Sequence, residues 1–249
     1  MSGHSKWSSI KHKKGAADAK RGAMFTKLAR AITIAARDGA DPEGNAALAH
    51  AIQKAKDSSM PKDNIERAIA KGAGLGKDAA AIEEVTYEGY GTSGVALLIH
   101  CHTDNRNRTG ADVRSMLSKN GGSLGEPGSV AWIFEKKGVI VVDAQKYTED
   151  ELFVAIDAGA EDIIEDGDFF EVVTEPTDYT AVRSALEAEG VEFQSADLIQ
   201  RPKTRIEVED SDAAKLFRLI ELLEDHDDVS DVAANFEVSD AALEALAAG

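Results

Sequence analysis

Lysine, histidine and tryptophan side chains are concentrated at the start of the chain, and these residue types are suited to binding nucleic acid. Residues 2–14 read S-G-H-S-K-W-S-S-I-K-H-K-K. Lysine ammonium groups bind phosphates, and an indole ring can stack on an unpaired base. We predict that this arm contacts nucleic acid through Lys6, Trp7, Lys11, His12, Lys13 and Lys14. The alternative is that the arm is only a solvated basic tail.

A helical pattern follows the arm and carries a second set of cations. From Ala16 to Arg37, apolar residues recur at spacings of three and four, which predicts an amphipathic helix. Most of its cations fall on the side opposite the apolar arc, so arm and helix together present one basic surface. The residues of this helix predicted to bind nucleic acid are Lys20, Arg21, Lys27, Arg30 and Arg37.

A third group of polar residues lies at a predicted junction between a strand and a helix. The segment T-D-N-R-N-R-T spans Thr103 to Thr109 and contains two arginines and two asparagines. The N-terminus of a helix is a favourable place for a phosphate or a carboxylate. We therefore include Arg106 and Arg108 among the predicted nucleic-acid-binding residues. Internal capping and ion pairing would explain the same residues equally well.

The residue patterns do not favour catalysis, a metal site or a cofactor. His100 and His102 would share one face of a strand, but the sequence offers no third metal ligand nearby. Gly89 to Gly94 matches G-x-G-x-x-G, yet a strand follows where a dinucleotide fingerprint needs a helix, so a hairpin turn is predicted. The single cysteine, Cys101, lacks the context of a reactive thiol. We predict a protein that is not an enzyme, with no catalytic residues, metal or cofactor.

Charge is distributed very unevenly along the 249 residues, whose net charge is −17. Residues 1–77 carry 15 Lys and Arg against 7 Asp and Glu, whereas residues 136–249 carry 9 against 30. Such asymmetry predicts an anionic partner at the basic end. The alternatives are that the basic end docks on the acidic end, or that the acidic half is an interaction module for a basic protein. No apolar run is long enough to span a membrane, and a cytoplasmic location without membrane contact is expected.

The predicted elements indicate a multidomain protein of α and β structure. Residues 1–77 are predicted to form a basic three-helix bundle with the arm, the second helix beginning at Asp41-Pro42 and the third after Pro61. Residues 136–202 show the order βαββαβ, which predicts a ferredoxin-like domain. The flanking segments, 78–135 and 203–249, would form one discontinuous α+β domain into which the ferredoxin-like domain is inserted. Within the first of these segments a strand is expected over 129–134.

Several segments resemble the YebC family. They are G-H-S-K-W (3–7), K-H-K-K-G (11–15), D-A-K-R-G (18–22), F-T-K-L (25–28), M-P-K-D-N-I-E-R-A (60–68), Y-E-G-Y-G (87–91), T-D-N-R-N-R-T (103–109) and F-E-K-K-G (134–138). Bacterial members of this family carry the label of transcriptional regulators, and organellar members are translational activators for cytochrome oxidase. The resemblance implies three domains, in agreement with the organisation predicted from the elements.

The resemblance implies a regulator of gene expression and allows two versions of it. In one, the protein binds promoter DNA through the basic arm and helix and changes transcription. In the other, it binds ribosomal or transfer RNA on the ribosome and relieves stalling at proline-rich sequences. The sequence shows no helix-turn-helix dimer signature, and a Lys- and Trp-containing arm suits irregular RNA better than a major groove.

Overall fold

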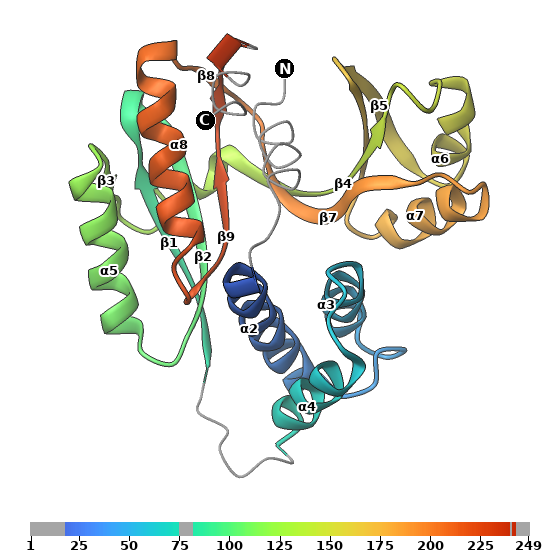
Figure 1. Ribbon diagram of the computed structural model, residues 1–249, viewed down its shortest axis with the longest axis horizontal. Helices are drawn as coiled ribbons and strands as arrows, with labels where there is room; N and C mark the ends of the chain where they lie inside the picture. The colour runs from blue at the N-terminus through green and yellow to red at the C-terminus, as the bar shows by residue number, and fades with distance from the viewer. Residues whose placement is uncertain (1–17, 75–81, 240, 243–249) are drawn as a thin grey trace. The chain divides into compact units, whose positions relative to one another are not determined.

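The computed structural model describes residues 18–74, 82–239 and 241–242 (Figure 1). Over these residues the chain forms seven α-helices and three β-sheets, and is therefore a mixed α and β protein. It divides into two compact units. The first unit contains the described residues of 15–130 and 214–232, and the second contains those of 131–213 and 233–249. No helix in these described ranges is both long and apolar enough to cross a membrane.

Helices dominate the beginning of the first unit. They are α2 (Asp18–Ala35), which continues into the 3-10 helix η1 (Ala36–Asp38), α3 (Ala46–Asp57) and α4 (Lys62–Gly72). Leu28, Ile32, Leu48 and Ile65 are buried between these helices, because each helix turns one apolar face inward. Gly72 ends α4 where a Cβ atom would lie 2.3 Å from the carbonyl oxygen of Thr33, so α4 approaches α2 closely only with glycine there.

The start of the second helix differs from the prediction. Asp41-Pro42 does not begin a helix, because Asp41 closes a turn by accepting hydrogen bonds from Glu43 N at 3.0 Å and Gly44 N at 3.2 Å. Asn45 is the N-cap of α3, and its side chain accepts from Leu48 N at 3.0 Å. The Asn45 amide also donates to the carbonyl oxygens of Ala35 and Gly39. These two tertiary bonds to the end of α2 favour the later start.

A four-stranded sheet and two helices make up the rest of the first unit. The strand order is β3-β1-β2-β9, with β1 at Glu83–Tyr90, β2 at Ala96–Thr103, β3 at Ser123–Leu124 and β9 at Val229–Ala234. The helices are α5 (Arg106–Lys119) and α8 (Asp210–Glu224) (Figure 1). Strands β1 and β2 pair antiparallel across the 3-10 turn η2 (Thr92–Gly94). The G-x-G-x-x-G segment is therefore a hairpin turn, as predicted.

The second unit contains a four-stranded antiparallel sheet with the order β5-β6-β4-β7. Its elements are β4 (Phe134–Asp143), the 3-10 helix η4 (Asp150–Leu152), α6 (Phe153–Asp157), β5 (Ala160–Asp166), β6 (Phe169–Thr174), α7 (Tyr179–Ala188) and β7 (Phe193–Pro202). Ile140, Val172, Val182 and Leu186 form part of the core on the helix-covered face. A short parallel pair, β8 (Ile206–Glu207) with β10 (Phe236–Glu237), completes the unit.

One strand prediction fails at the start of the second unit. The strand expected over 129–134 is absent, because residues Ala131–Ile133 form the 3-10 helix η3 and β4 begins only at Phe134. The apolar run over 130–134, which is compatible with a strand, includes this short turn. That turn leaves Trp132 68% exposed, whereas Val130 and Phe134 on either side are buried.

Candidate nucleic-acid interface

Three of the cations predicted on the first helix bind other residues of the first unit. The Lys27 ammonium donates to the carbonyl oxygen of Glu224, and Arg37 donates to that of Ile82 at 2.7 Å. Arg30 donates to the carbonyl oxygens of Asp227 at 2.7 Å and His102 at 3.3 Å. These bonds hold α2 against the end of β2 and the segment before β9. Phosphate binding by these three residues stays a prediction, and in this structure they attach the helix to the sheet.

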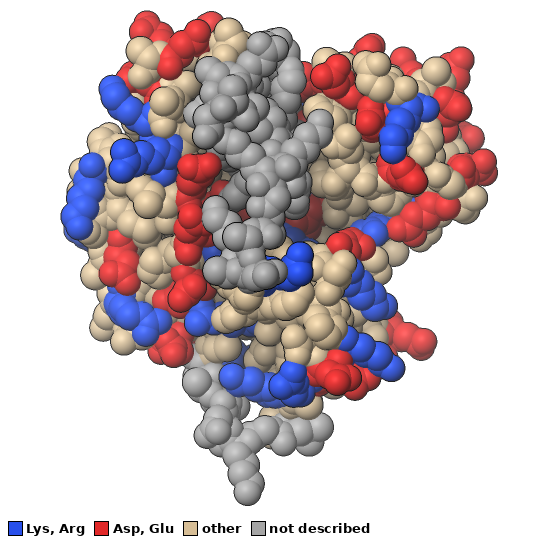
Figure 2. Space-filling view, in the orientation of Figure 1, with Lys and Arg blue, Asp and Glu red and all other residues tan. Residues whose placement is uncertain are grey.

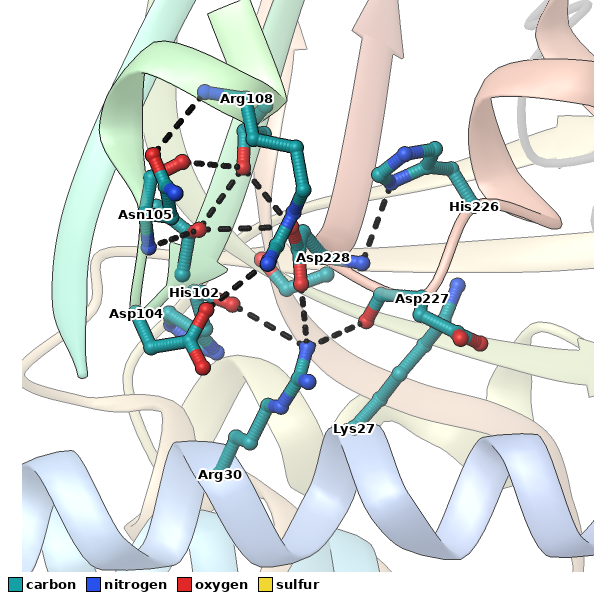
Figure 3. A network of polar contacts seen from close by, with 12 residues as sticks. Lys27, Arg30, His102, Asp104, Asn105, Arg108, His226, Asp227 and Asp228 are labelled. Atoms are coloured by element: carbon teal, nitrogen blue, oxygen red, sulfur yellow. Dashed lines mark hydrogen bonds and ion pairs between the residues drawn. The ribbon is translucent and has the colours of Figure 1, made fainter. Parts of the chain in front are cut away.

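Asp228 lies at the centre of this attachment (Figure 3). Its side chain is only 3% exposed, and its two carboxylate oxygens bind arginines from different helices. Arg30 of α2 donates to Oδ1 at 2.8 Å, and Arg108 of α5 donates to Oδ2 at 2.8 Å. The hydroxyl of Thr109 donates to the same Oδ2 at 2.7 Å. One buried carboxylate thus joins α2, the start of α5 and the loop before β9.

The hydrogen bonds to Asp228 determine its protonation state. Burial by itself would raise the pKa of this carboxyl group. The bonds from Arg108, Thr109 and Arg30 outweigh burial and lower the pKa to about 2. Asp228 is therefore an anion at neutral pH, and part of the positive charge of Arg30 and Arg108 is neutralised within the protein.

The backbone around Asp228 is held as firmly as its side chain. Its amide donates to Nδ1 of His226 at 3.1 Å, and its carbonyl oxygen accepts from His102 N at 2.8 Å. Nδ1 of His226 must therefore be an acceptor, which leaves the proton of a neutral ring on Nε2. These bonds hold the backbone of Asp228 in place, and with it the carboxylate that binds the two arginines.

The two arginines at the start of α5 differ in their surroundings. Asn105 caps the helix by accepting from Arg108 N at 3.1 Å, so the predicted capping role is real. Arg108 also forms an ion pair with Asp104 at 2.9 Å, although 48% of its side chain is exposed. Arg106 is exposed, and no described acceptor lies within hydrogen-bonding distance of its guanidinium. Arg106 is thus the residue of this pair whose side chain remains available to a ligand.

A groove between α2 and α4 offers a further cationic surface that sequence reasoning missed. The groove has a volume of about 560 Å³, opens to solvent and is lined by three cations, with no acidic residue among its lining. Its lining residues are Gly22, Phe25, Thr26, Ala29, Arg30, Thr33, Met60, Asn64, Arg67, Ala68, Lys71 and Ile82. The i, i+4 spacing of Arg67 and Lys71 was the signal available in the sequence, because such residues share a helix face.

The charges of the groove differ in how far they are already engaged. Arg67 is exposed and donates to the carbonyl oxygen of Asp63 at 3.1 Å and to the side chain of Asn64. Lys71 is half-buried, and no described acceptor lies within bonding distance of its ammonium group. Figure 2 shows Lys and Arg side chains spread over the surface of α3 and α4. Helix α4 therefore presents Arg67 and Lys71 without a described carboxylate partner.

The arm residues Lys6, Trp7, Lys11, His12, Lys13 and Lys14 lie outside the described residues. Lys20 falls within α2, but its side chain is also outside what is described, and Arg21 is exposed near the beginning of that helix. The structure therefore brings together Arg30 and Arg108 among the predicted site residues, and joins them through Asp228. Sequence reasoning missed Asp228, because nothing local marks it among the neighbouring acids.

Histidine and cysteine side chains of β2 do not form a metal centre. Over the described residues, no group of three or more His, Cys, Asp or Glu side chains is placed to hold a metal ion. Burial raises the pKa of the Cys101 thiol to about 12, so the thiol stays protonated at neutral pH. Burial lowers the pKa of His102. These groups pack in the sheet and show no arrangement for nucleophilic chemistry.

Comparison with known proteins assigns the chain to a family. Residues 5–75 match the N-terminal domain of the TACO1/YebC proteins, and residues 82–236 match their second and third domains. The chain belongs to the TACO1/YebC family. These matches, to an N-terminal domain and to a second and a third domain, show a multidomain protein.

Full-length relatives within the TACO1/YebC family are similar over nearly the whole chain. A protein of Rubrobacter xylanophilus is 53% identical over 249 residues, covering 99% of this chain and all of the relative. A protein of Desulfotalea psychrophila is 55% identical over 251 residues, with the same coverage. Both are named "Probable transcriptional regulatory protein". The crystal structure of the conserved hypothetical protein Aq1575 from Aquifex aeolicus has a TM-score of 0.79 at 43% identity, covering 90% of this chain and 93% of that chain.

The segments that carry the YebC resemblance also supply much of the groove. The segment D-A-K-R-G contributes Gly22, and F-T-K-L contributes Phe25 and Thr26. The segment M-P-K-D-N-I-E-R-A contributes Met60, Asn64, Arg67 and Ala68. Three stretches that are separate in the sequence therefore meet on one surface of this TACO1/YebC protein.

Proposed function

We propose that this protein is a regulator of gene expression that binds nucleic acid and does not act as an enzyme. The observation that carries the proposal is the groove between α2 and α4, where Arg67 and Lys71, with no acidic residue among the lining, face a solvent-open surface. Nucleic acid is the polyanion that such a surface would bind in a regulator of gene expression. The names of the relatives, which describe transcriptional regulatory proteins, support regulation as the outcome.

Two kinds of nucleic acid remain candidates for the target. The names of the relatives favour promoter DNA and transcription. The shape of the groove favours an unpaired strand, because a hollow of about 560 Å³ can receive a single unstacked nucleotide. The partly exposed ring of Phe25 would contact a base, while Arg67 and Lys71 would bind the adjoining phosphates. This observation supports the RNA version, in which the protein assists translation on the ribosome.

The domain organisation that accompanies this proposal is the one predicted from the sequence. The bundle of residues 1–77 would carry the arm and the groove. Residues 136–202 would be a ferredoxin-like insertion, which the strand order β5-β6-β4-β7 and the helices α6 and α7 support. Residues 78–135 and 203–249 would form the domain that is interrupted. We expect the protein to act in the cytoplasm.

The groove is tested by two charge reversals on the same helix. Lys71→Glu changes a cation of the groove, and Lys62→Glu makes the same charge change at a residue that is exposed and outside the groove. Binding to labelled single-stranded RNA and to duplex DNA is measured by fluorescence anisotropy over a range of salt concentrations. We expect Lys71→Glu to weaken RNA binding and to reduce the salt slope by about 0.7, the value for one phosphate contact. Equal effects of the two variants would remove the groove from the proposal.

The target class is tested in cells. RNA crosslinked to the tagged protein is sequenced beside a chromatin immunoprecipitation of the same protein. We expect ribosomal or transfer RNA to be recovered without promoter enrichment. Promoter enrichment with no RNA crosslinks would overturn the RNA version and support the DNA version.

A protein-interaction role for the acidic half is the remaining alternative. Asp and Glu side chains predominate over α6 and β5 (Figure 2). If that surface binds a basic protein, the tagged full chain should retain the partner after nuclease treatment. Loss of every partner on nuclease treatment would leave nucleic acid as the only binding partner shown.

A further inference from the structure

Trp132 is a large apolar side chain that the fold leaves in contact with water. At 68% exposure it is more exposed than Phe153, Leu222 or Ile156, the other exposed large hydrophobic residues in the described part of the chain. It belongs to η3, directly before β4, and its neighbours Val130 and Phe134 are buried. An exposed indole combines a flat apolar ring with one polar N–H group, and such rings are enriched at binding surfaces.

Lys203 positions positive charge beside this ring. Its backbone amide donates to the carbonyl oxygen of Ile133 at 2.8 Å, and its ammonium group donates to that of Trp132 at 3.1 Å. The register of β4 with β7 places Phe134 opposite Pro202 and Lys136 opposite Gln200. Lys136 is the third residue of β4, and β4 begins two residues after Trp132.

These cations differ from the others of the second unit in their partners. Lys137, Lys146 and Arg183 each form an ion pair with a glutamate, the last two at 2.8 and 2.9 Å. Lys136 and Lys203 are exposed and form no ion pair with a described residue, whereas Arg205 interacts electrostatically with Glu237 and Arg201 reaches Glu171 at 4.0 Å. In the second unit, therefore, Lys137, Lys146 and Arg183 are paired with acids, whereas Lys136 and Lys203 have no described carboxylate partner.

We propose that Trp132, Lys136 and Lys203 form a second contact for single-stranded nucleic acid, which we call the Trp132 contact. The indole would stack on one unpaired base, and the cations would bind phosphates on either side of it. Stacking requires an exposed ring face, and phosphate binding requires cations that no carboxylate already holds. The proposal rests on the proposed function, because it presupposes that the chain binds nucleic acid.

The sequence makes a direct optical test of this contact feasible. Trp7 and Trp132 are the only two tryptophans of the chain. In the full-length Trp7→Phe variant, all tryptophan fluorescence therefore comes from Trp132. We expect a short oligouridine to quench that fluorescence, because a stacked base quenches an indole. Unchanged fluorescence at an oligouridine concentration that saturates binding, as measured by anisotropy, would overturn the proposal.

Affinity measurements separate stacking from charge. Trp132→Ala should weaken binding of a labelled oligouridine about 5- to 100-fold and leave the salt slope unchanged, whereas Trp132→Phe should restore most of the affinity. The double variant Lys136→Ala/Lys203→Ala should instead reduce the slope by about 1.4. Phe153→Ala is the matched control, because it removes another exposed aromatic ring, which lies on α6 among acidic residues. It should leave binding unchanged.

The outcomes distinguish this inference from the proposed function. If the wild-type protein binds neither RNA nor DNA, the proposed function fails. If the wild type binds and Trp132→Ala binds equally well, only the Trp132 contact fails and the groove of the first unit stands. Loss of a captured protein partner in Trp132→Ala, with oligouridine affinity intact, would assign this surface to a protein and overturn the proposal.

Discussion

Neutralising Asp228 should destabilise the first unit at neutral pH, and the structure sets the size of the effect. The substitution Asp228→Asn keeps the shape of the side chain and removes its charge. The pKa of Asp228 falls from an ordinary value of 3.8 to about 2 in the folded protein. Because each pKa unit corresponds to about 1.4 kcal/mol, the charged carboxylate contributes about 2.5 kcal/mol to the free energy of unfolding. Loss of about 2–3 kcal/mol is therefore expected for Asp228→Asn.

The sign of the pH dependence follows from the direction of the pKa shift. A carboxyl group whose pKa is lower in the folded state stabilises the fold above its unfolded pKa. The contribution of Asp228 is therefore complete above about pH 4 and is lost as the pH falls from about 4 to about 2. The difference in stability between wild type and Asp228→Asn should be constant from neutral pH to about pH 5. It should shrink below that range.

Urea unfolding followed by circular dichroism measures this difference, with Asp227→Asn as the matched control. Asp227 is the preceding residue, its side chain is exposed, and only its backbone oxygen accepts a hydrogen bond from Arg30. The control changes the net charge equally and should alter stability by less than about 0.5 kcal/mol. If the two variants were equally stable at pH 7, the reasoning that Asp228 joins the helical part to the sheet would be refuted.

Two further predictions concern the cations. Arg108→Ala should lower the melting temperature, because it removes a donor to buried Asp228. Arg106→Ala should leave the melting temperature unchanged and reduce the salt slope of RNA binding by about 0.7. A lower melting temperature for Arg106→Ala alone would contradict this assignment. Removing residues 1–14 deletes Lys6, Lys11, Lys13 and Lys14 and should reduce the salt slope by about 2.8, the value for four phosphate contacts, without unfolding the protein. Equal slopes for the truncated and full-length proteins would show that the arm is only a solvated tail.

Local residue patterns were sufficient to predict most of the elements. Periodicity and turn residues predict a helix after Pro61 and a hairpin across Asp166-Gly167, and the structure has both. Thr148 and Glu151 have the T-x-x-E spacing that predicts a capped helix over 148–158, and Thr148 N donates to Glu151 at 2.7 Å. The helix expected over 148–158 is nevertheless split into η4 and α6. Such elements are determined locally because their hydrogen bonds join residues that are close in the chain.

Helix boundaries were less predictable where a distant residue competes with the local signal. Asp41-Pro42 is a strong start signal, yet Asn45 caps α3 because its amide also binds the end of α2. Trp132 lies in the segment 129–134, for which a strand was expected, and the turn that forms instead exposes it. In both places the outcome depends on which tertiary contacts the chain can make, and periodicity carries no information about those contacts.

The sequence by itself determined the family, the segregation of charge and the residue types suited to binding phosphate. Only the tertiary structure decided which cations remain available to a ligand. Arg30 and Asp228 are 198 residues apart and meet at 2.8 Å, so a helix face that is basic in the sequence becomes an internal attachment. Lys71 and Arg106 find no described carboxylate or carbonyl partner. The physical reason is that a charge is neutralised by whichever opposite charge the fold brings within a few ångströms, and sequence separation does not limit that distance.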